Sequence, residues 1–117
     1  MTDLTLYHNP SCSKSRGALE ILEARGLSPK IVRYLDTPPS AAELQALLVK
    51  LGLPARQLLR TGEEAYKSLN LADASLSEAQ LIAAMVAHPK LIERPILIAG
   101  ERAIVGRPPE RILELLA

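Results

Sequence analysis

Four short β-prone runs fall into two pairs, one near each end of the chain, with a long helical stretch between the pairs. The runs are residues 4–7, 30–35, 95–98 and 103–105. A helical pattern that ends at Gly26 joins the first pair, so these strands should be parallel with a right-handed crossover. Gly100 and Glu101 look like a two-residue turn between the strands of the second pair, which predicts an antiparallel hairpin. Prolines 108–109 open a last helix. The pattern predicts an α/β fold with a four-stranded mixed sheet and helices packed on it.

The middle of the chain, residues 37–92, has a helical pattern. Ser40 and Glu43 have the spacing of a capping box, as do Ser77 and Gln80, and a stripe of apolar residues follows each box. No repeat, low-complexity tract or linker divides the chain. We therefore expect a single domain over all 117 residues, with this helical stretch inserted between the two halves of the sheet.

The composition supports a packed core and argues against binding of nucleic acid. Hydrophobic residues make up 48% of the chain and charged residues 23%, which suits a folded domain. Lysines and arginines number 14 against 13 acidic residues, so the net charge is only +1. Aromatic residues make up 3%, too few for a base-stacking surface. We expect no nucleic-acid partner.

The single cysteine and the absence of a long apolar run predict a protein of the cytoplasm. A single cysteine, Cys12, can form neither an internal disulfide nor a cysteine-based zinc site. The N-terminus has no signal-peptide pattern, and no apolar run reaches the roughly 20 residues of a membrane span. Neither a metal-ligand cluster nor a nucleotide-binding loop is present in the sequence. We expect no membrane contact, no bound metal or flavin, and a monomer.

Cys12 lies just after the first predicted strand, where the first helix should begin. Free amides and the positive end of the helix dipole favour a thiolate there, and Lys14 and Arg16 add positive charge. The same features bind oxyanions. Most lone cysteines are small buried hydrophobic residues, but serines at positions 11, 13 and 15 argue against an apolar pocket. We interpret Cys12 as a nucleophile beside an oxyanion site.

Two familiar cysteine chemistries are missing from this segment. Cysteine phosphatases need an arginine six positions after the cysteine, and Ala18 occupies that position. Dithiol oxidoreductases need a second cysteine at Ser15. The chain therefore has one attacking sulfur and no local resolving thiol.

Several motifs follow one another along nearly the whole chain. They are Tyr7-His8-Asn9-Pro10, Cys12, Ser15-Arg16, Tyr34-Leu35-Asp36-Thr37-Pro38-Pro39, Leu58-Leu59-Arg60, His88-Pro89, Glu93-Arg94-Pro95-Ile96 and Gly106-Arg107-Pro108. In this order they resemble the glutaredoxin-coupled arsenate reductase family, and most of all its short arsenate-reductase-like branch. The resemblance implies a thioredoxin-like fold. The arsenate reductases have Gly-Thr where this chain has Ser13-Lys14.

The resemblance also assigns roles to particular residues. Cys12 would be the nucleophile, and Arg60, Arg94 and Arg107 would bind the oxyanion, which guanidinium groups match well. The thioredoxin-like fold places a cis proline opposite the cysteine, which would be Pro95, although the sequence alone favours trans. Two supporting residues complete the set, His8 and Ser15. His8 could tune the thiolate or hold the loop, and Ser15 could donate to the sulfur or simply begin the helix.

The implied activity is reduction of arsenate to arsenite. Glutathione would be the co-substrate and glutaredoxin the partner that regenerates Cys12. Two alternatives remain open. One is a glutathione-dependent thiol reductase that acts on other oxidised substrates, and the other is a non-enzymatic regulator that binds RNA polymerase. The redox-sensing members of the second group use C-x-x-C, which Ser15 removes here.

Overall fold

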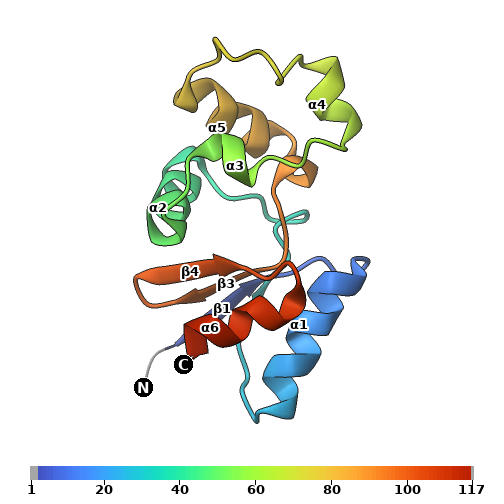
Figure 1. Ribbon diagram of the computed structural model, residues 1–117, viewed down its shortest axis with the longest axis vertical. Helices are drawn as coiled ribbons and strands as arrows, with labels where there is room; N and C mark the ends of the chain where they lie inside the picture. Colours follow the sequence, from blue (N-terminus) through green and yellow to red (C-terminus); the bar gives the residue numbers. More distant parts are fainter. Residues whose placement is uncertain (1–2, 117) are drawn as a thin grey trace. The chain divides into compact units, whose positions relative to one another are not determined.

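The computed structural model describes residues 3–116 and divides the chain into two units. We call residues 1–37 with 94–117 the sheet unit, and residues 38–93 the helical unit. Figure 1 labels most of their helices and strands. A single domain over all 117 residues stays a prediction.

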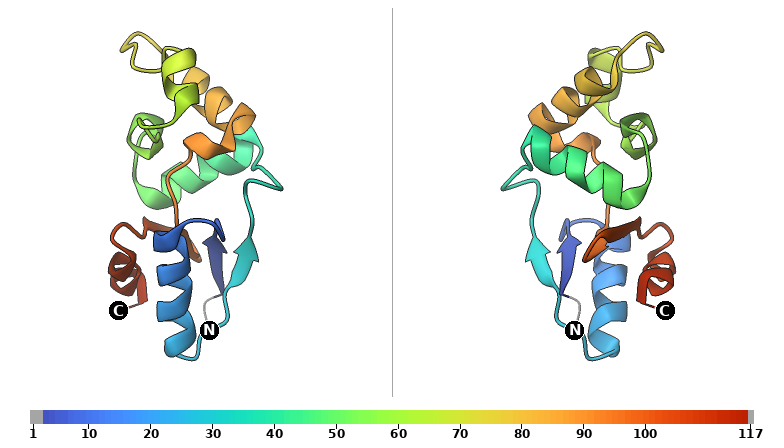
Figure 2. Two further views of the ribbon diagram at one scale, coloured as in Figure 1. Left: turned by 90° about the vertical axis from the view of Figure 1, so that its right-hand side faces the viewer. Right: turned by 90° about the vertical axis from the view of Figure 1, so that its left-hand side faces the viewer.

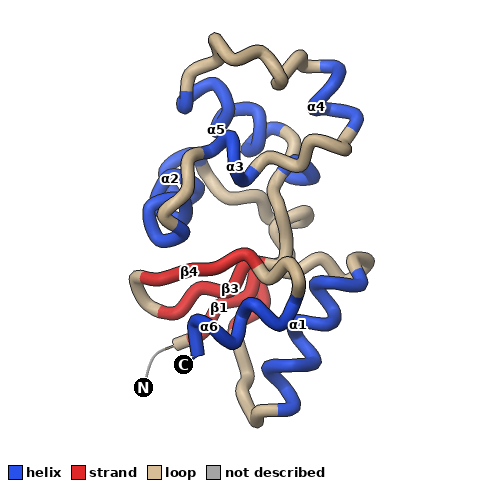
Figure 3. Tube along the Cα trace, in the orientation of Figure 1, coloured by secondary structure: helices blue, strands red, loops and turns tan. Residues whose placement is uncertain are grey.

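The sheet unit contains the predicted four-stranded mixed sheet, drawn in red in Figure 3. Its strands are β1 (Leu4–Tyr7), β2 (Lys30–Val32), β3 (Ile96–Ala99) and β4 (Arg102–Val105), in the order β2-β1-β3-β4. β1 is parallel to β2 and antiparallel to β3, and β3 and β4 form the expected hairpin around Gly100 and Glu101. Gly100 has a φ of 63°, a conformation that glycine adopts at little cost.

The second strand is shorter than the predicted run of 30–35, which is a correction. Pairing with β1 stops at Val32, and the chain then turns, because the amides of Asp36 and Thr37 both donate to the carbonyl of Arg33. Tyr34 is fully buried and stacks on Tyr7, with ring centroids 6.1 Å apart. The β-prone character of this segment therefore serves core packing beyond the end of the strand.

One face of the sheet carries α1 (Ser13–Ala24) and the C-terminal segment, which is a 3₁₀ turn (Pro109–Ile112) followed by α6 (Leu113–Leu116). Leu6 and Leu97 pair directly across β1 and β3, so they point to the same face. They form a core with four residues of these helices: Ala18, Leu22, Ile112 and Leu115. This core fixes α1, and with it Cys12, against the sheet.

The helical unit contains α2 (Ala41–Leu51), α3 (Ala55–Leu58), α4 (Glu64–Ser68), α5 (Glu78–Ala87) and the 3₁₀ turn Pro89–Leu91. Figure 2 shows this unit from two further sides. Both predicted capping boxes are present: Ser40 and Ser77 each accept from the amide three residues on, and Glu43 and Gln80 bond back. Within residues 3–116, no helix is long and apolar enough to cross a membrane.

Candidate active site

Cys12 is the N-cap residue of α1, at the end of the loop that follows β1. Its backbone is extended (φ −97°, ψ 122°), its amide donates to the carbonyl of Asn9 (3.0 Å), and its carbonyl accepts from the amide of Arg16 (3.0 Å). The side chain is half-buried, and within the described residues it makes no capping hydrogen bond. The amides of Lys14 and Ser15, in the first turn of α1, nevertheless lie near enough to the sulfur to lower its pKa.

The pKa of Cys12 lies below the ordinary value of a thiol. Burial alone would raise it. The amide of Ser15, a hydrogen bond from the Arg94 side chain, the amide of Lys14 and the charge of Arg94 together outweigh burial. The thiolate is thus stabilised by one guanidinium and two backbone N–H groups, an arrangement typical of reactive cysteines.

The charged neighbours differ from those that the sequence suggested. Lys14 acts on the sulfur through its backbone amide, and the guanidinium of Arg16 donates to the carbonyl of Pro10 (2.9 Å). The side-chain charge that acts on the thiolate belongs to Arg94, which is 82 positions away in the sequence. Only the tertiary fold brings this cation to Cys12.

Ser15 connects the two sides of the cysteine loop. It is fully buried, and its hydroxyl bonds to His8 Nδ1 (2.6 Å) and accepts from the amide of Asn9 (3.0 Å). The side-chain oxygen of Asn9 in turn accepts from the amide of Ser11 (3.0 Å). These contacts give the Ser15 hydroxyl a role in support of the loop, which is neither of the two roles considered from the sequence, while its backbone amide faces the sulfur.

His8 belongs to the same network. It is buried, and burial, followed by the charges of Arg33 and Arg16, lowers the pKa of its ring below the usual value. The imidazole is therefore neutral near pH 7. A neutral His8 hydrogen-bonded to Ser15 fits the loop-holding alternative better than the role of a charged neighbour of the thiolate.

Arg94 and Arg107 both precede a cis proline, at the start of β3 and just after β4. The cis bond at Pro95 matches what the family resemblance implies; the one after Arg107 was not expected. Arg107 Nη1 donates to the carbonyl of Arg94 (3.2 Å), which joins the two arginine segments. The structure thus brings Cys12, Arg94, Arg107 and Pro95 into one part of the sheet unit.

A glycine allows these segments to approach closely. The amide of Gly106 donates to the carbonyl of Pro95 (2.8 Å). A Cβ atom at Gly106 would lie 3.0 Å from Pro95 Cγ and 3.0 Å from Ile112 Cγ2. No side chain fits there without displacing one of these two residues.

Arg60 lies in the helical unit, where two carboxylates flank it. Its Nε is 3.8 Å from an oxygen of Glu63 and 3.8 Å from an oxygen of Glu93. Its Nη1 is buried and has no hydrogen-bond partner among residues 3–116. Convergence of Arg60 on Cys12 stays a prediction, since the two residues belong to different units.

The model of the ArsC family matches residues 7–115 of this chain. The chain belongs to the ArsC family. Among its relatives are a protein of Escherichia coli K12 named uncharacterized protein YfgD, 55% identical over 95% of this chain and 94% of that protein, and the arsenate reductase of Haemophilus influenzae, 52% identical over 95% and 97%. The solved structure of arsenate reductase from Vibrio cholerae superposes with a TM-score of 0.94, at 51% identity over 97% of each chain.

These findings confirm the family resemblance and the predicted fold class. The ArsC chain has the thioredoxin-like α/β architecture that the resemblance implied. The comparisons give no role to any individual residue, so those roles rest on the contacts of Cys12, Ser15 and Arg94.

Sequence reasoning missed several residues that contact the candidate site residues within each unit of this ArsC chain. Asn9 was not singled out, although Asn before a turn often bonds nearby amides. Glu63 stands three residues after Arg60, but the two lie in the loop between α3 and α4, so no helical spacing pointed to the pair. Glu93 gave no local signal. Among residues 3–116, no three His, Cys, Asp or Glu side chains gather as metal ligands would.

Proposed function

We propose that this protein is an arsenate reductase in which Cys12 is the nucleophile and glutathione supplies the second thiol. The observation that carries the proposal is the place of the Cys12 sulfur at the start of α1, where the Ser15 amide, Arg94 and the Lys14 amide lower its pKa. The names of the Haemophilus influenzae and Vibrio cholerae relatives support arsenate as the substrate.

Arsenate is a tetrahedral oxyanion and needs several donors. The first-turn amides of α1 and the guanidinium of Arg94 surround the thiolate and would hold the arsenate oxygens next to it. Arg107 carries a second guanidinium in the same part of the unit and anchors the backbone of Arg94. Arg60 would complete the set if it reaches the same anion.

The first chemical step forms a bond between sulfur and arsenic. The Cys12 thiolate attacks the arsenic atom, an As–O bond breaks, and the oxygen leaves as water after protonation. Arsenic stays pentavalent in this adduct, because the exchange of oxygen for sulfur moves no electrons to it. A lowered thiol pKa speeds this step by keeping the nucleophile ionised.

The second step supplies the two electrons. A glutathione thiolate attacks the Cys12 sulfur, an S–S bond forms, and the S–As bond breaks with its electron pair left on arsenic. Arsenic is thereby reduced to the trivalent state and leaves as arsenite, while two thiols are oxidised to one mixed disulfide. Glutaredoxin then removes the glutathione by thiol–disulfide exchange, which returns Cys12 as a thiolate.

An external thiol is required because the chain has one cysteine. The position where a C-x-x-C partner would stand is Ser15, whose hydroxyl is already held by His8 and Asn9. Reduced glutathione and glutaredoxin are available in the cytosol, which agrees with the expected location of the protein.

The deciding experiment measures arsenite release by the purified protein with glutathione and glutaredoxin, beside mass spectrometry of the protein after incubation with arsenate and glutathione. We expect arsenite to accumulate and a glutathione adduct to form on Cys12. Cys12→Ser should lose both. Sustained release of arsenite without any added thiol would overturn the mechanism.

The same assay separates the two alternatives. An adduct on Cys12 that reduces other disulfides but yields no arsenite would favour a general thiol reductase. No adduct, together with capture of RNA polymerase by the wild-type protein, would favour the regulator.

A further inference from the structure

The sheet unit has an open groove at the end of the sheet opposite Cys12. β1 begins there, the β3–β4 hairpin turns there and α1 ends there, whereas Cys12 lies where α1 begins. The volume of this distal groove is about 550 Å³, within the usual range for small-molecule sites. Its lining includes neither Cys12 nor any arginine assigned to arsenate.

Five of the seven described residues that line the distal groove are apolar. They come from β1, the segment after α1, the end of β3, and α6: Leu4, Leu27, Ala99, Leu115 and Leu116. These residues pack against the core of the sheet unit, and all of them except Leu115 are only partly buried. The groove therefore exposes an edge of the core to solvent, and an apolar ligand would gain free energy by covering it.

The remaining residues of the wall are two arginines, Arg25 and Arg102. Both are exposed, and within residues 3–116 neither guanidinium makes an ion pair or a hydrogen bond. No carboxylate of the described residues lines the groove. Two guanidiniums beside an apolar wall, with no acidic side chain between them, favour an anionic ligand.

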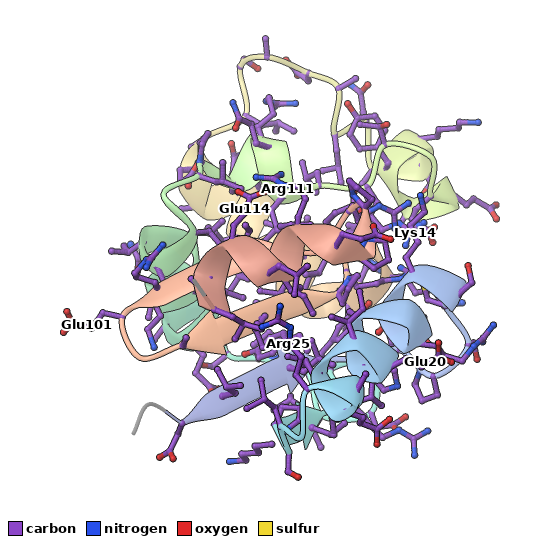
Figure 4. The ribbon with its side chains drawn as sticks, turned by 60° about the horizontal axis from the view of Figure 1, so that its bottom comes forward. Lys14, Glu20, Arg25, Glu101, Arg111 and Glu114 are labelled. Carbon is purple, nitrogen blue, oxygen red and sulfur yellow. The ribbon has the colours of Figure 1, made fainter. Side chains whose placement is uncertain are left out.

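Among residues 3–116, no carboxylate forms an ion pair with Arg25 or Arg102. Figure 4 shows the Arg25 side chain extending from the end of α1 into the space beside α6, whereas Glu101 points outward from the hairpin. Arg111 and Glu114 lie on the other side of α6 in this view and are paired with each other (Nε to Oε2, 3.4 Å). Arg111 is therefore a natural reference: an exposed arginine of the same unit that already has its carboxylate.

We propose that the distal groove binds a single-chain amphiphilic anion of the fatty-acid carboxylate class. The tail would cover the leucines, and the carboxylate would accept hydrogen bonds from Arg25 and Arg102. A free inorganic anion would leave the apolar wall uncovered, and a neutral chain would leave both guanidiniums without an acceptor. Tight binding should therefore need both the apolar tail and the carboxylate of the ligand.

The test titrates the full-length wild-type protein with octanoate, decanoate and dodecanoate below their micelle concentrations, by calorimetry. We expect one saturable site, with an affinity that rises about three- to fourfold for each added methylene. Decanol, acetate and inorganic phosphate should each bind at least about tenfold more weakly than decanoate.

Three variants in the groove and one control outside it identify the binding site. Arg25→Gln and Arg102→Gln should each weaken decanoate binding about tenfold, as expected for loss of a charge-assisted hydrogen bond. Arg111→Gln removes the same charge outside the groove and should leave the affinity unchanged. Ala99→Leu, which narrows the groove and keeps both arginines, should weaken dodecanoate binding more than acetate binding.

The outcomes that would overturn the proposal are distinct. Absence of saturable binding up to about 1 mM decanoate would exclude the site. Equal binding of decanol would indicate an apolar patch only, and equal binding of phosphate would indicate a plain anion site. Equal losses in Arg111→Gln and Arg25→Gln would indicate a nonspecific charge effect. None of these measurements depends on arsenate reduction.

Discussion

The helix that carries Cys12 begins differently from the two longest helices of the helical unit. α2 and α5 begin at Ser40 and Ser77, whose hydroxyls each accept an amide hydrogen bond at 3.1 Å, while Glu43 and Gln80 bond back to the cap. α1 begins at Cys12 in a similar extended conformation, but within the described residues no side-chain hydrogen bond closes its cap.

The difference separates a helix start that stabilises the fold from one that can bind a ligand. A capping box satisfies first-turn donors within the helix, whereas an open cap leaves them for a thiolate and an oxyanion. The first turn of α1, which is fully described, also contains no acidic residue, while α2 and α5 have Glu43 and Glu78 there. An acidic side chain in that turn would repel arsenate.

Replacing the cap of α1 should have the largest effect on activity. Cys12→Ser removes the nucleophile and should lower arsenite release more than about 1000-fold. Serine is nevertheless a favourable N-cap residue, so the free energy of unfolding should stay the same or rise by up to about 1 kcal/mol. Kinetic assays and urea denaturation measure the two effects. A large loss of stability would contradict the comparison, because it would give the sulfur a structural role.

Removing the cation beside the open cap should have the next largest effect. Arg94→Ala deletes a hydrogen bond and a charge that lower the pKa of Cys12, so that pKa should rise. Arsenate reduction should fall about 10- to 100-fold. Alkylation by iodoacetamide, followed against pH, should have its midpoint below the free-thiol value of about 8.5 in the wild type and higher in the variant.

The same pKa predicts a pH dependence of stability. The folded-state pKa of Cys12 lies below that of the unfolded chain. Ionisation of Cys12 therefore contributes stability that is fully present above the unfolded pKa and is lost as the pH falls through the folded pKa. Arg94→Ala should shrink this contribution. An alkylation midpoint at or above the free-thiol value in the wild type would refute the argument.

Opening the closed caps should affect stability and leave chemistry unchanged. Ser40→Ala and Ser77→Ala each remove a hydrogen bond to a first-turn amide, and each should lower the free energy of unfolding by about 1 kcal/mol. Arsenite release at saturating arsenate should not change. Ser28→Ala, at an exposed loop position, is the matched control and should have little effect on stability.

Moving the cysteine to a closed cap sharpens the comparison further, with the smallest effect. In a Cys12→Ser background, Ser77→Cys places a thiol at an N-cap next to first-turn amides. Its alkylation midpoint should fall below the free-thiol value but stay above that of wild-type Cys12, which also has the Arg94 guanidinium. Equal midpoints would mean that the helix start alone activates the sulfur.

Much of the fold could be predicted because its signals are local. The parallel pair of β1 and β2 and the β3–β4 hairpin followed from the order of the apolar runs, and the capping boxes followed from three-residue spacings. The antiparallel pairing of β1 with β3, which joins the two pairs, was not predicted. The predicted end of β2 was wrong because pairing with β1 stops at Val32. Tyr34, a residue type common in strands, packs on Tyr7 after the strand has ended.

The site was only partly predictable, since its decisive contacts join residues far apart in sequence. The place of Cys12 at a helix start is a local property and was found. Its cation is Arg94, and the bond from Arg107 to the Arg94 carbonyl depends on two distant segments. The sequence could name these arginines through family resemblance but could not say which one acts on the sulfur.

The buried hydroxyl of Ser15 has a consequence for how the protein obtains its electrons. A single Ser15→Cys exchange would recreate a dithiol motif on paper. The new sulfur would replace an oxygen that bonds to His8 and Asn9 in a fully buried position, and a poor acceptor there costs about 1–3 kcal/mol. In the proposed mechanism, this single exchange would therefore remove the need for an external thiol only at a cost to the stability of the loop.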